Sequence, residues 1–427
     1  MSSPHRTSQP TQRRRVRRAS RSRVYRRRRL LALIALIAIV AVLGGVIWAA
    51  LGGGDAGSAG DGTTSSAGSG GEKDAAEVKI APSPSPTAWT GPPSSSLKLK
   101  LRKTIVSSDI APKSVVSTGT GYVFAQNMMY KHSMTVYDAR TLKLIETIPD
   151  EIDAGKFRIR GHGETIQGSP VEAAAMPDGR FMYVSQYSMF GDGYTEGQDV
   201  CAPGDGTDKS YVYRVPLDTL AVDKVIPVGA VPKYLAVTPD QKYLLVSNWC
   251  SYSLSVVDIH RSKQIESVDL GPYPRGIAVS PDSKTACVAV MGNNDIAEVD
   301  LRDFSVSWIR GVGRGPRHLC MAPNGKYLYA TVNGEGTVAK IDPKTRKVVD
   351  KVATGAQPRS MAIAPDGRSL FVVNYDSSTM SMVRTSDMKV IDTVNTNARP
   401  IGITYDAPTK SVWLCCYTGS IMVFKQV

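Results

Sequence analysis

The sequence predicts an all-β fold, a seven-bladed β-propeller of four-stranded blades, and three observations lead to it. A proline that opens a β-rich unit recurs at a constant step of 42 residues, at Pro232, Pro274, Pro316, Pro358 and Pro400. Two less regular copies of the unit begin at Pro112 and Pro170, which makes seven units. The last unit ends one strand short, and residues 97–106 supply a strand at the front of the region.

Each unit contains four β-rich runs separated by turn residues. The stretch "QPRSMAIAPDGRSLFVVN" (residues 357–374) shows the first two runs, joined by a Pro-Asp-Gly turn. A period of 40–45 residues with four strands is typical of propeller blades. We expect the strand at 97–106 to complete the last blade, because this pairing leaves no sheet edge open between the two ends of the ring.

The chain before the propeller has three parts. Residues 1–29 contain twelve Arg and no Asp, Glu or Lys, and the rest of the chain carries 40 Lys and Arg against 38 Asp and Glu. Residues 30–51 are uncharged and, as a helix, would span roughly 33 Å, enough for a bilayer. Residues 52–96 are rich in Gly, Ser and Pro and predict a disordered linker.

This arrangement predicts a single-pass protein of the bacterial cell membrane. The Arg-rich tail favours a cytoplasmic N-terminus by the positive-inside rule, which places the propeller at 97–427 outside. An uncleaved anchor is favoured over a signal peptide, whose apolar core is usually shorter. Since the propeller region is nearly neutral, we expect no nucleic-acid partner, and the basic tail has a topological role.

The repeat region resembles a known family, the YVTN-type (YncE-like) β-propellers. The motifs that carry the resemblance are "PRGIAVSPDSK", "PRSMAIAPDGRSLFVVN" and "GKYLYATVNGEGTVAKIDPKTRKVVDKVATG". The resemblance covers residues 97–427 and implies the same seven-bladed fold. That family includes binding proteins, surface proteins and relatives of enzymes, so the resemblance does not fix the function.

Two insertions interrupt the regular repeat. Residues 150–169 follow the outermost strand of blade 1, and residues 189–208 join the second and third strands of blade 2. Loops of these two types emerge on the same face of a propeller, so both insertions should lie above blades 1–3. Long loops on a rigid scaffold commonly carry function.

The six cysteines divide into two groups. Cys201 lies in the second insertion and Cys250 in the matching loop of blade 3, so we expect them to form a disulfide in an extracytoplasmic compartment, the alternative being two free thiols. Cys287 and Cys320 occupy repeat positions held elsewhere by core residues. Cys415 and Cys416 are strand neighbours, and no spacing indicates structural zinc.

Candidate ligand-binding residues follow from position in the repeat. The residue after the opening proline is cationic in five units, where it is Lys113, Lys233, Arg275, Arg317 or Arg359. Ring closure places these residues around the central channel, where they would attract an anionic group. In the alternative interpretation their side chains fix the inner strand by bonding neighbouring carbonyls. Trp249 and Tyr194 belong to a set of aromatic residues on the irregular face that suits glycans or peptides, unless the rings only pack their own loops.

A second interpretation is enzymatic. His162, Glu164, Glu172 and His318 would form a His/Glu set at the propeller mouth that binds a divalent metal or acts as acid and base, the alternative being solvated loop histidines. The leading hypothesis is a membrane-tethered module that binds a glycan, a peptide or an envelope protein without catalysis, metal or cofactor. The runner-up is a lyase or hydrolase that uses the His/Glu set.

Overall fold

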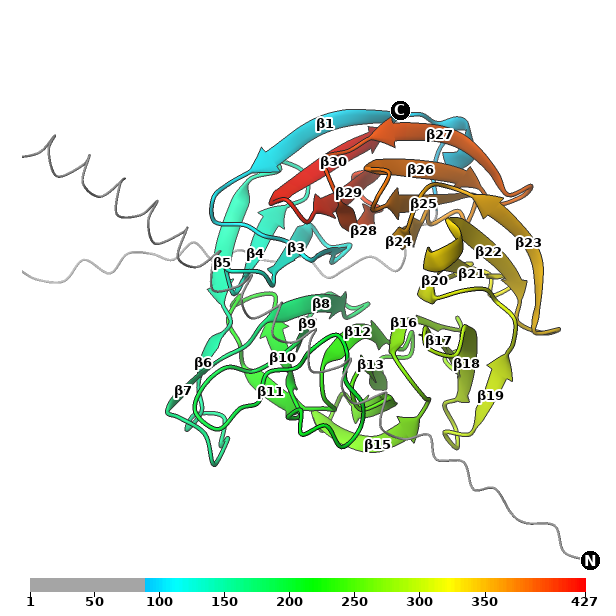
Figure 1. The fold of residues 1–427 in the computed structure, drawn as a ribbon. Helices are drawn as coiled ribbons and strands as arrows, with labels where there is room; N and C mark the ends of the chain where they lie inside the picture. Colours follow the sequence, from blue (N-terminus) through cyan, green and yellow to red (C-terminus); the bar gives the residue numbers. More distant parts are fainter. Residues whose placement is uncertain (1–88) are drawn as a thin grey trace, which may run out of the picture. The chain divides into compact units, whose positions relative to one another are not determined.

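The structure, a computed structural model, describes residues 89–427, which form seven four-stranded antiparallel sheets around a common axis (Figure 1). Blade 1 contains β2 (Ser114–Ser117), β3 (Tyr122–Asn127), β4 (Ser133–Asp138) and β5 (Leu144–Pro149). Blade 2 contains β8 (Pro170–Ala175), β9 (Phe181–Gln186), β10 (Tyr211–Pro216) and β11 (Lys224–Pro227). Blade 3 contains β12 (Pro232–Val237), β13 (Tyr243–Asn248), β14 (Ser253–Asp258) and β15 (Lys263–Asp269).

The remaining blades keep the same order from centre to rim. Blade 4 contains β16 (Pro274–Val279), β17 (Thr285–Val290), β18 (Asp295–Asp300) and β19 (Val306–Ile309). Blade 5 contains β20 (Pro316–Met321), β21 (Leu328–Val332), β22 (Thr337–Asp342) and β23 (Lys347–Ala353). Blade 6 contains β24 (Pro358–Ile363), β25 (Ser369–Asn374), β26 (Thr379–Arg384) and β27 (Lys389–Asn395). Six of the seven inner strands of the propeller begin at their repeat proline.

Blade 7 closes the ring as predicted. It combines β28 (Pro400–Asp406), β29 (Ser411–Cys416) and β30 (Ser420–Gln426) with β1 (Leu99–Val106) as its outermost strand. β1 runs antiparallel to β30 from the pair Leu99–Gln426 to the pair Val106–Ser420. The two ends of the described chain are therefore joined by a strand pairing, and each inner strand contacts the inner strand of the next blade.

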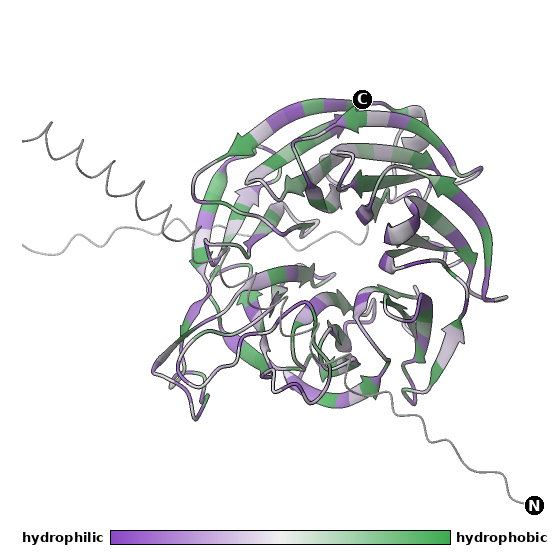
Figure 2. Ribbon diagram, viewed as in Figure 1, coloured by the Kyte–Doolittle hydropathy of each residue, from purple (hydrophilic) through white to green (hydrophobic). Residues whose placement is uncertain are grey.

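The hydrophobic core lies between adjacent blades rather than at the ring centre. One cluster joins blades 6 and 7, where the ring of Phe371 stacks on that of Tyr405 with centroids 5.5 Å apart. The outer strands β1 and β23 carry both hydrophobic and hydrophilic residues (Figure 2), and most residues of both strands are exposed. Cys415 and Cys416 enter two different clusters, so they point to opposite faces of β29 as predicted.

Two of the inner strands approach a neighbouring inner strand closely at a glycine, Gly276 or Gly402. A Cβ atom on Gly276 would lie 2.6 Å from the carbonyl oxygen of Arg317 in the next blade. Glycine at this position lets the backbones of β16 and β20 approach each other. Arg275, the preceding residue, forms an ion pair with Glu172 of β8 at 3.5 Å.

A recurring asparagine explains another part of the repeat. Asn127, Asn248 and Asn374 end the second strand of blades 1, 3 and 6 and are fully buried. The Nδ2 atom of Asn248 donates hydrogen bonds to Ser253 Oγ at 3.2 Å and Ser255 Oγ at 2.9 Å, across the loop to the third strand. These bonds satisfy the buried amide nitrogen and fix the loop that follows, whereas Oδ1 of Asn248 has no hydrogen-bond partner within residues 89–427.

The contacts of the propeller begin before β1. Residues 89–96, which we expected within the linker, include the short 3₁₀ helix η1 (Ser94–Ser96). The buried Ser94 donates from its backbone nitrogen and its hydroxyl to the carboxylate of Asp366 in blade 6. The predicted tail, membrane helix and most of the linker lie outside the described residues. Within residues 89–427 no helix has the length and apolar character needed to cross a bilayer.

Candidate functional site

The two insertions contact each other, and the first contains a hairpin of β6 (Glu151–Asp153) and β7 (Thr165–Gln167) beside blade 2 (Figure 1). Gln167 and Phe190 exchange two backbone hydrogen bonds between the insertions, at 3.0 and 2.7 Å. The ring of His162 stacks on that of Tyr194 with centroids 3.6 Å apart. The insertions thus form one continuous structure, as their predicted position on one face requires.

A disulfide between Cys201 and Cys250 joins the second insertion to blade 3, as predicted, with the Cα atoms 5.3 Å apart. Both cysteines are buried, and the hydroxyl of Tyr252 donates to the carbonyl of Cys201 at 2.9 Å. The insertion therefore has two attachments, the contact with the first insertion near the rim and a covalent one to the neighbouring blade. A cross-link that closes 48 intervening residues stabilises the fold by about 4 kcal/mol in the chain-entropy model.

The segment before Cys201 reaches the centre of the ring. Asp199 accepts a hydrogen bond from Lys233 Nζ at 3.0 Å and another from the Tyr187 hydroxyl at 3.2 Å. The indole nitrogen of Trp249 donates to the backbone carbonyl of Asp199 at 3.0 Å. The ammonium of Lys233 lies 4.0 Å from the ring centroid of Tyr187 and 5.1 Å from that of Trp249, within cation–π range.

The five predicted cations come together at the centre. Four of them are buried with 5–9% of their surface exposed, and the fifth, Arg359, is half-buried; they are Lys113, Lys233, Arg275, Arg317 and Arg359. Their charges act on one another, since Arg275 lowers the pKa of Lys113, Lys233 and Arg317 alike. Val171 and Ile401 occupy the matching positions in blades 2 and 7, so the cations do not form a complete ring.

Three of these cations have side-chain partners. Arg275 pairs with Glu172 of blade 2 at 3.5 Å, and Lys233 pairs with Asp199. The guanidinium of Arg359 lies 3.7 Å from the ring centroid of Tyr375 and donates to Gln357 Oε1 at 3.1 Å. The charged partners therefore come from blade 2 and its insertion.

The other two cations lack such partners within residues 89–427. Lys113 Nζ and Arg317 Nε are buried without a hydrogen-bond partner, as is Nε of Arg359. None of the five cations donates to a backbone carbonyl in the described part of the chain, so the interpretation that they fix the inner strands by carbonyl bonds has no support. At β16 that task falls to Ser247, whose hydroxyl donates to the carbonyl of Arg275 at 2.6 Å.

Burial shifts the titration of this cluster. The pKa of Lys113 lies well below its ordinary value because of desolvation and the charge of Arg275. Desolvation raises the pKa of Glu172, and the neighbouring cations oppose this shift. Burial and then Arg275 lower the pKa of Lys233 to about 7, within the physiological range.

The His/Glu set divides between two places: Glu172 and His318 lie at the ring centre near Arg275, and His162 and Glu164 lie in the first insertion. His318 is buried in β20, its Nε2 lies 3.3 Å from the Tyr234 hydroxyl, and burial with the charge of Arg275 lowers its pKa to about 3. His162 stacks on Tyr194 in the insertions, while Glu164 is exposed. No group of three or more His, Cys, Asp or Glu within 89–427 is arranged to hold a metal ion.

Tyr194, predicted as a ligand contact, packs within the insertions: its hydroxyl lies 3.4 Å from that of Tyr211, and its ring belongs to the cluster that includes Ile166. Trp249, by contrast, contacts the central cations. Sequence reasoning placed Tyr187 among the aromatic residues of the irregular face, but it missed Asp199. The available signal was that Asp199 lies two residues before a cysteine expected to be bridged, which fixes its backbone.

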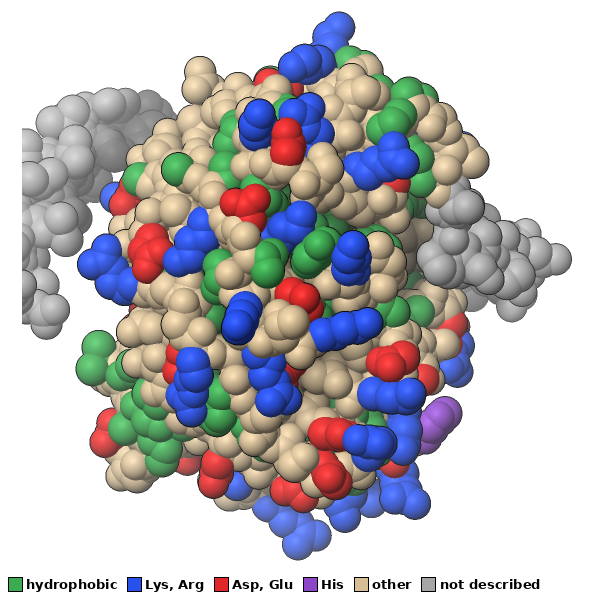
Figure 3. Space-filling model, turned by 90° about the vertical axis from the view of Figure 1, so that its right-hand side faces the viewer, with side chains coloured by type: hydrophobic (Ala, Val, Ile, Leu, Met, Phe, Trp, Pro, Cys, Tyr) green, Lys and Arg blue, Asp and Glu red, His purple; other side chains and the backbone are tan. Residues whose placement is uncertain are grey.

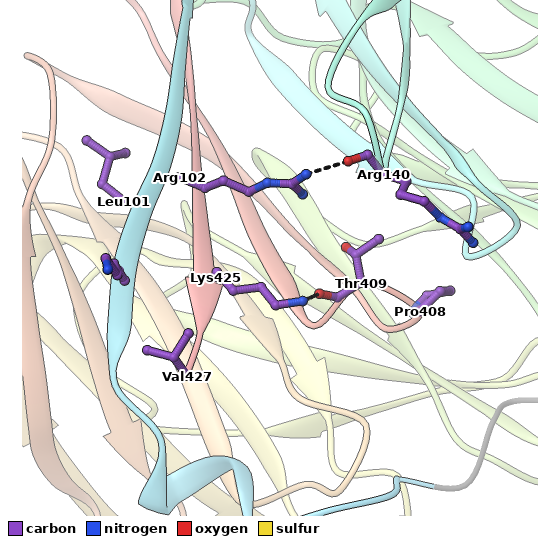
Figure 4. A pocket seen from close by; sticks show the side chains of 8 residues that line it. Leu101, Arg102, Arg140, Pro408, Thr409, Lys425 and Val427 are labelled. Atoms are coloured by element: carbon purple, nitrogen blue, oxygen red, sulfur yellow. Dashed lines mark hydrogen bonds between the residues drawn. The ribbon is translucent and has the colours of Figure 1, made fainter.

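The outer surface of the propeller also carries a groove lined by basic residues, away from the central cations. On the side of the propeller in Figure 3, basic and acidic side chains are interspersed. A groove of about 550 Å³ between blades 7 and 1 is lined by Lys100, Leu101, Arg102, Arg140, Pro408, Thr409, Lys425 and Val427 (Figure 4). Arg102 donates to the carbonyl of Arg140 at 2.5 Å and Lys425 to that of Thr409, so two of the four cations have partners there.

Comparison with known proteins supports a seven-bladed propeller family without defining an activity. A family model described as "Lactonase, 7-bladed beta-propeller" matches residues 321–399, less than half of the chain. A solved structure of Kuenenia stuttgartiensis hydrazine synthase has a TM-score of 0.61 and 19% identity, and the match covers 75% of this chain and 97% of that one. At this identity the similarity shows the fold alone. No curated protein sequence matches the chain.

Proposed function

We propose that this chain is a membrane-tethered, extracytoplasmic binding module that holds its ligand on the loop-rich face above blades 1–3. The observation that carries the proposal is the path of the second insertion. It extends from its contact with the first insertion to the ring centre, where Asp199 bonds Lys233, and the disulfide to Cys250 holds it in place. Such bracing produces a preorganised surface of rings and charges, which favours binding.

The tether rests on the composition of residues 30–51 and on the twelve Arg before them. A disulfide and an external location agree with each other, because oxidising compartments preserve disulfides. The ligand classes that suit the aromatic residues around Lys233 are glycans and peptides, or an exposed segment of an envelope protein.

Binding without catalysis fits this geometry better than a lyase or hydrolase. The pKa of His318, lowered to about 3 by burial and the charge of Arg275, keeps its imidazole neutral at physiological pH, so it does not carry the proton that an imidazolium acid would donate. The segment that matches the lactonase model lies in blades 5 and 6 and contains none of His162, Glu164, Glu172 or His318. That match therefore does not favour a hydrolase with these residues.

The test is thermal unfolding of the purified full-length chain with a panel of glycans, peptides and small organic acids. We expect one class to raise the melting temperature, and Trp249→Ala to reduce this shift. Lys326→Gln, at an exposed turn position of blade 5, is the matched control and should keep it. A panel without effect, or shifts equal in all variants, would contradict the proposal. A stoichiometric divalent ion lost in His162→Ala or His318→Ala would favour the enzyme.

A further inference from the structure

Only two of the five central cations of the propeller form ion pairs with carboxylates in the described chain. Five blades contribute Lys or Arg at the same repeat position, whereas the ion-paired carboxylates, Glu172 and Asp199, come from blade 2 and its insertion. These carboxylates pair with Lys233 and Arg275 on one side of the ring. Lys113 in blade 1 and Arg317 in blade 5 form no ion pair or side-chain hydrogen bond within residues 89–427, and the charge of Glu172 offsets only in part the burial and the charge of Arg275 that lower the pKa of Lys113.

Unpaired charge at this depth is unusual. Lys113 is 8% exposed and Arg317 is 9% exposed, yet Nζ of the first and Nε of the second make no hydrogen bond within residues 89–427. Buried cations are normally paired with a carboxylate or a bound anion, because an isolated charge loses its hydration without compensation. A bound anion would therefore compensate the positive charges that these two side chains carry.

We propose that the centre of the ring binds an oxyanion, a carboxylate or phosphate group of the ligand, through Lys113 and Arg317 with help from Arg359. This inference rests on the proposed function, because it names the chemistry of the ligand at the same site. The guanidinium presents parallel donors that match a carboxylate or phosphate, and the ammonium adds a point charge.

The burial of the cluster restricts the shape of the ligand. Only 5–9% of the surface of Lys113, Lys233, Arg275 and Arg317 remains exposed. A slender terminal anionic group can reach such atoms, whereas the continuous backbone of a nucleic acid contacts exposed surface cations. The partly exposed rings of Trp249 beside Lys233 and of Tyr375 beside Arg359 are available to the body of the ligand, whereas Tyr187 is buried.

The electrostatics of the cluster agree with this geometry. The pKa of Arg317 lies well below its ordinary value because of burial, and next because of the positive charges of Arg275 and Arg359. Lys113 has a pKa lowered by the same two causes, burial and Arg275. The positive potential at the centre is therefore only partly neutralised by Glu172 and Asp199, and it would attract an anion.

The experiment measures anion binding by the purified full-length chain at constant ionic strength. Inorganic phosphate and citrate are each titrated against a chloride reference by calorimetry and thermal unfolding. We expect at least one of the two to bind and to raise the melting temperature. Tighter binding of phosphate would identify a phosphate-bearing ligand, and tighter binding of citrate a carboxylate.

Two variants separate a binding role from a structural one. Arg317→Gln removes an unpaired buried charge, so it should unfold at the same or a higher temperature without anion while the anion binds about tenfold more weakly. Lys113→Met should likewise weaken anion binding without lowering the melting temperature. Arg317→Lys should retain part of the affinity for the anion. The control Lys326→Gln should bind the anion as tightly as the wild type. Phosphate and citrate that act no more strongly than chloride would overturn the inference, as would unchanged binding by Arg317→Gln. A neutral ligand that depends on Trp249 but not on Arg317 would leave the proposed function standing and reject the oxyanion.

Discussion

Blades 1 and 2 differ from blades 3 to 6 in a way that explains how a repetitive chain builds a single site. Blades 3 to 6 follow the 42-residue step and place a cation at the second position of every inner strand, from Lys233 to Arg359. Blades 1 and 2 carry both insertions and supply Glu172 and Asp199. The repeat thus provides nearly symmetric positive charge, and the irregular blades make it asymmetric.

Opening the ring should have the largest effect on stability, because every blade packs against two neighbours in the closed ring. Deleting residues 97–106 removes β1, which pairs with β30 along its length, and leaves blade 7 with three strands. We expect the variant to lose cooperative thermal unfolding, measured by calorimetry and circular dichroism. If the variant retains the wild-type transition, closure by β1 does not hold the propeller together.

The disulfide tests whether the insertion depends on its covalent attachment to the regular blade 3. Replacing Cys201 and Cys250 together by Ser should lower the free energy of unfolding by about 4 kcal/mol at most, and the melting temperature with it. Removal of Cys287 by Ser is not a suitable control, because Cys287 is buried in the core. The better control is the wild-type protein with and without reductant. Peptide mapping that finds Cys201 alkylated as a free thiol would contradict the bridge.

The pH dependence of anion binding sharpens the role of the cation that pairs with the insertion. Lys233 faces Asp199, Arg275 and Arg317 and the rings of Tyr187 and Trp249, and its pKa is about 7 because of burial and Arg275. A bound anion favours the protonated amine, so binding takes up a proton above that pH. We therefore expect the affinity for phosphate or citrate to fall as the pH rises above about 7, by at most about tenfold per unit.

Calorimetric titrations across this pH range measure the slope directly. Lys233→Met has no ionisable amine and should show a flatter profile than the wild type. A wild-type affinity that does not change between about pH 6 and about pH 9 would show that Lys233 is not linked to the anion.

The smallest effect concerns the turn between the first and second strands of each blade, such as the turn between β12 and β13. Gln241 occupies the turn position that is Gly325 in blade 5 and Gly367 in blade 6, and all three have a positive φ, of 61°, 70° and 68°. Oε1 of Gln241 is also buried without a hydrogen bond in the described chain. Gln241→Gly should therefore raise the free energy of unfolding by about 1 kcal/mol, because glycine adopts this conformation without strain. A destabilised variant, seen by chemical denaturation, would contradict this assignment.

The fold of the repeats could be predicted from the sequence because the same pattern of proline, strands and turns recurs in each of them. The opening prolines give the strand starts, the missing strand gives the closure, and the cysteine positions give the bridge from Cys201 to Cys250. The site was predictable only in part. The five cations follow from their repeat position, but Asp199 and Tyr187 lie in or beside an insertion whose path has no internal pattern. The contacts of Tyr194 with His162 of the first insertion and Tyr211 of β10 could not be predicted for the same reason.

The most direct measurement is a crystal structure of the full-length chain soaked with selenate, whose selenium gives an anomalous signal. We predict a peak at the ring centre, with oxygen atoms about 2.8 Å from Lys113 Nζ and from the guanidinium of Arg317. A peak confined to the basic groove between blades 7 and 1, or no peak within reach of Arg317, would contradict the account.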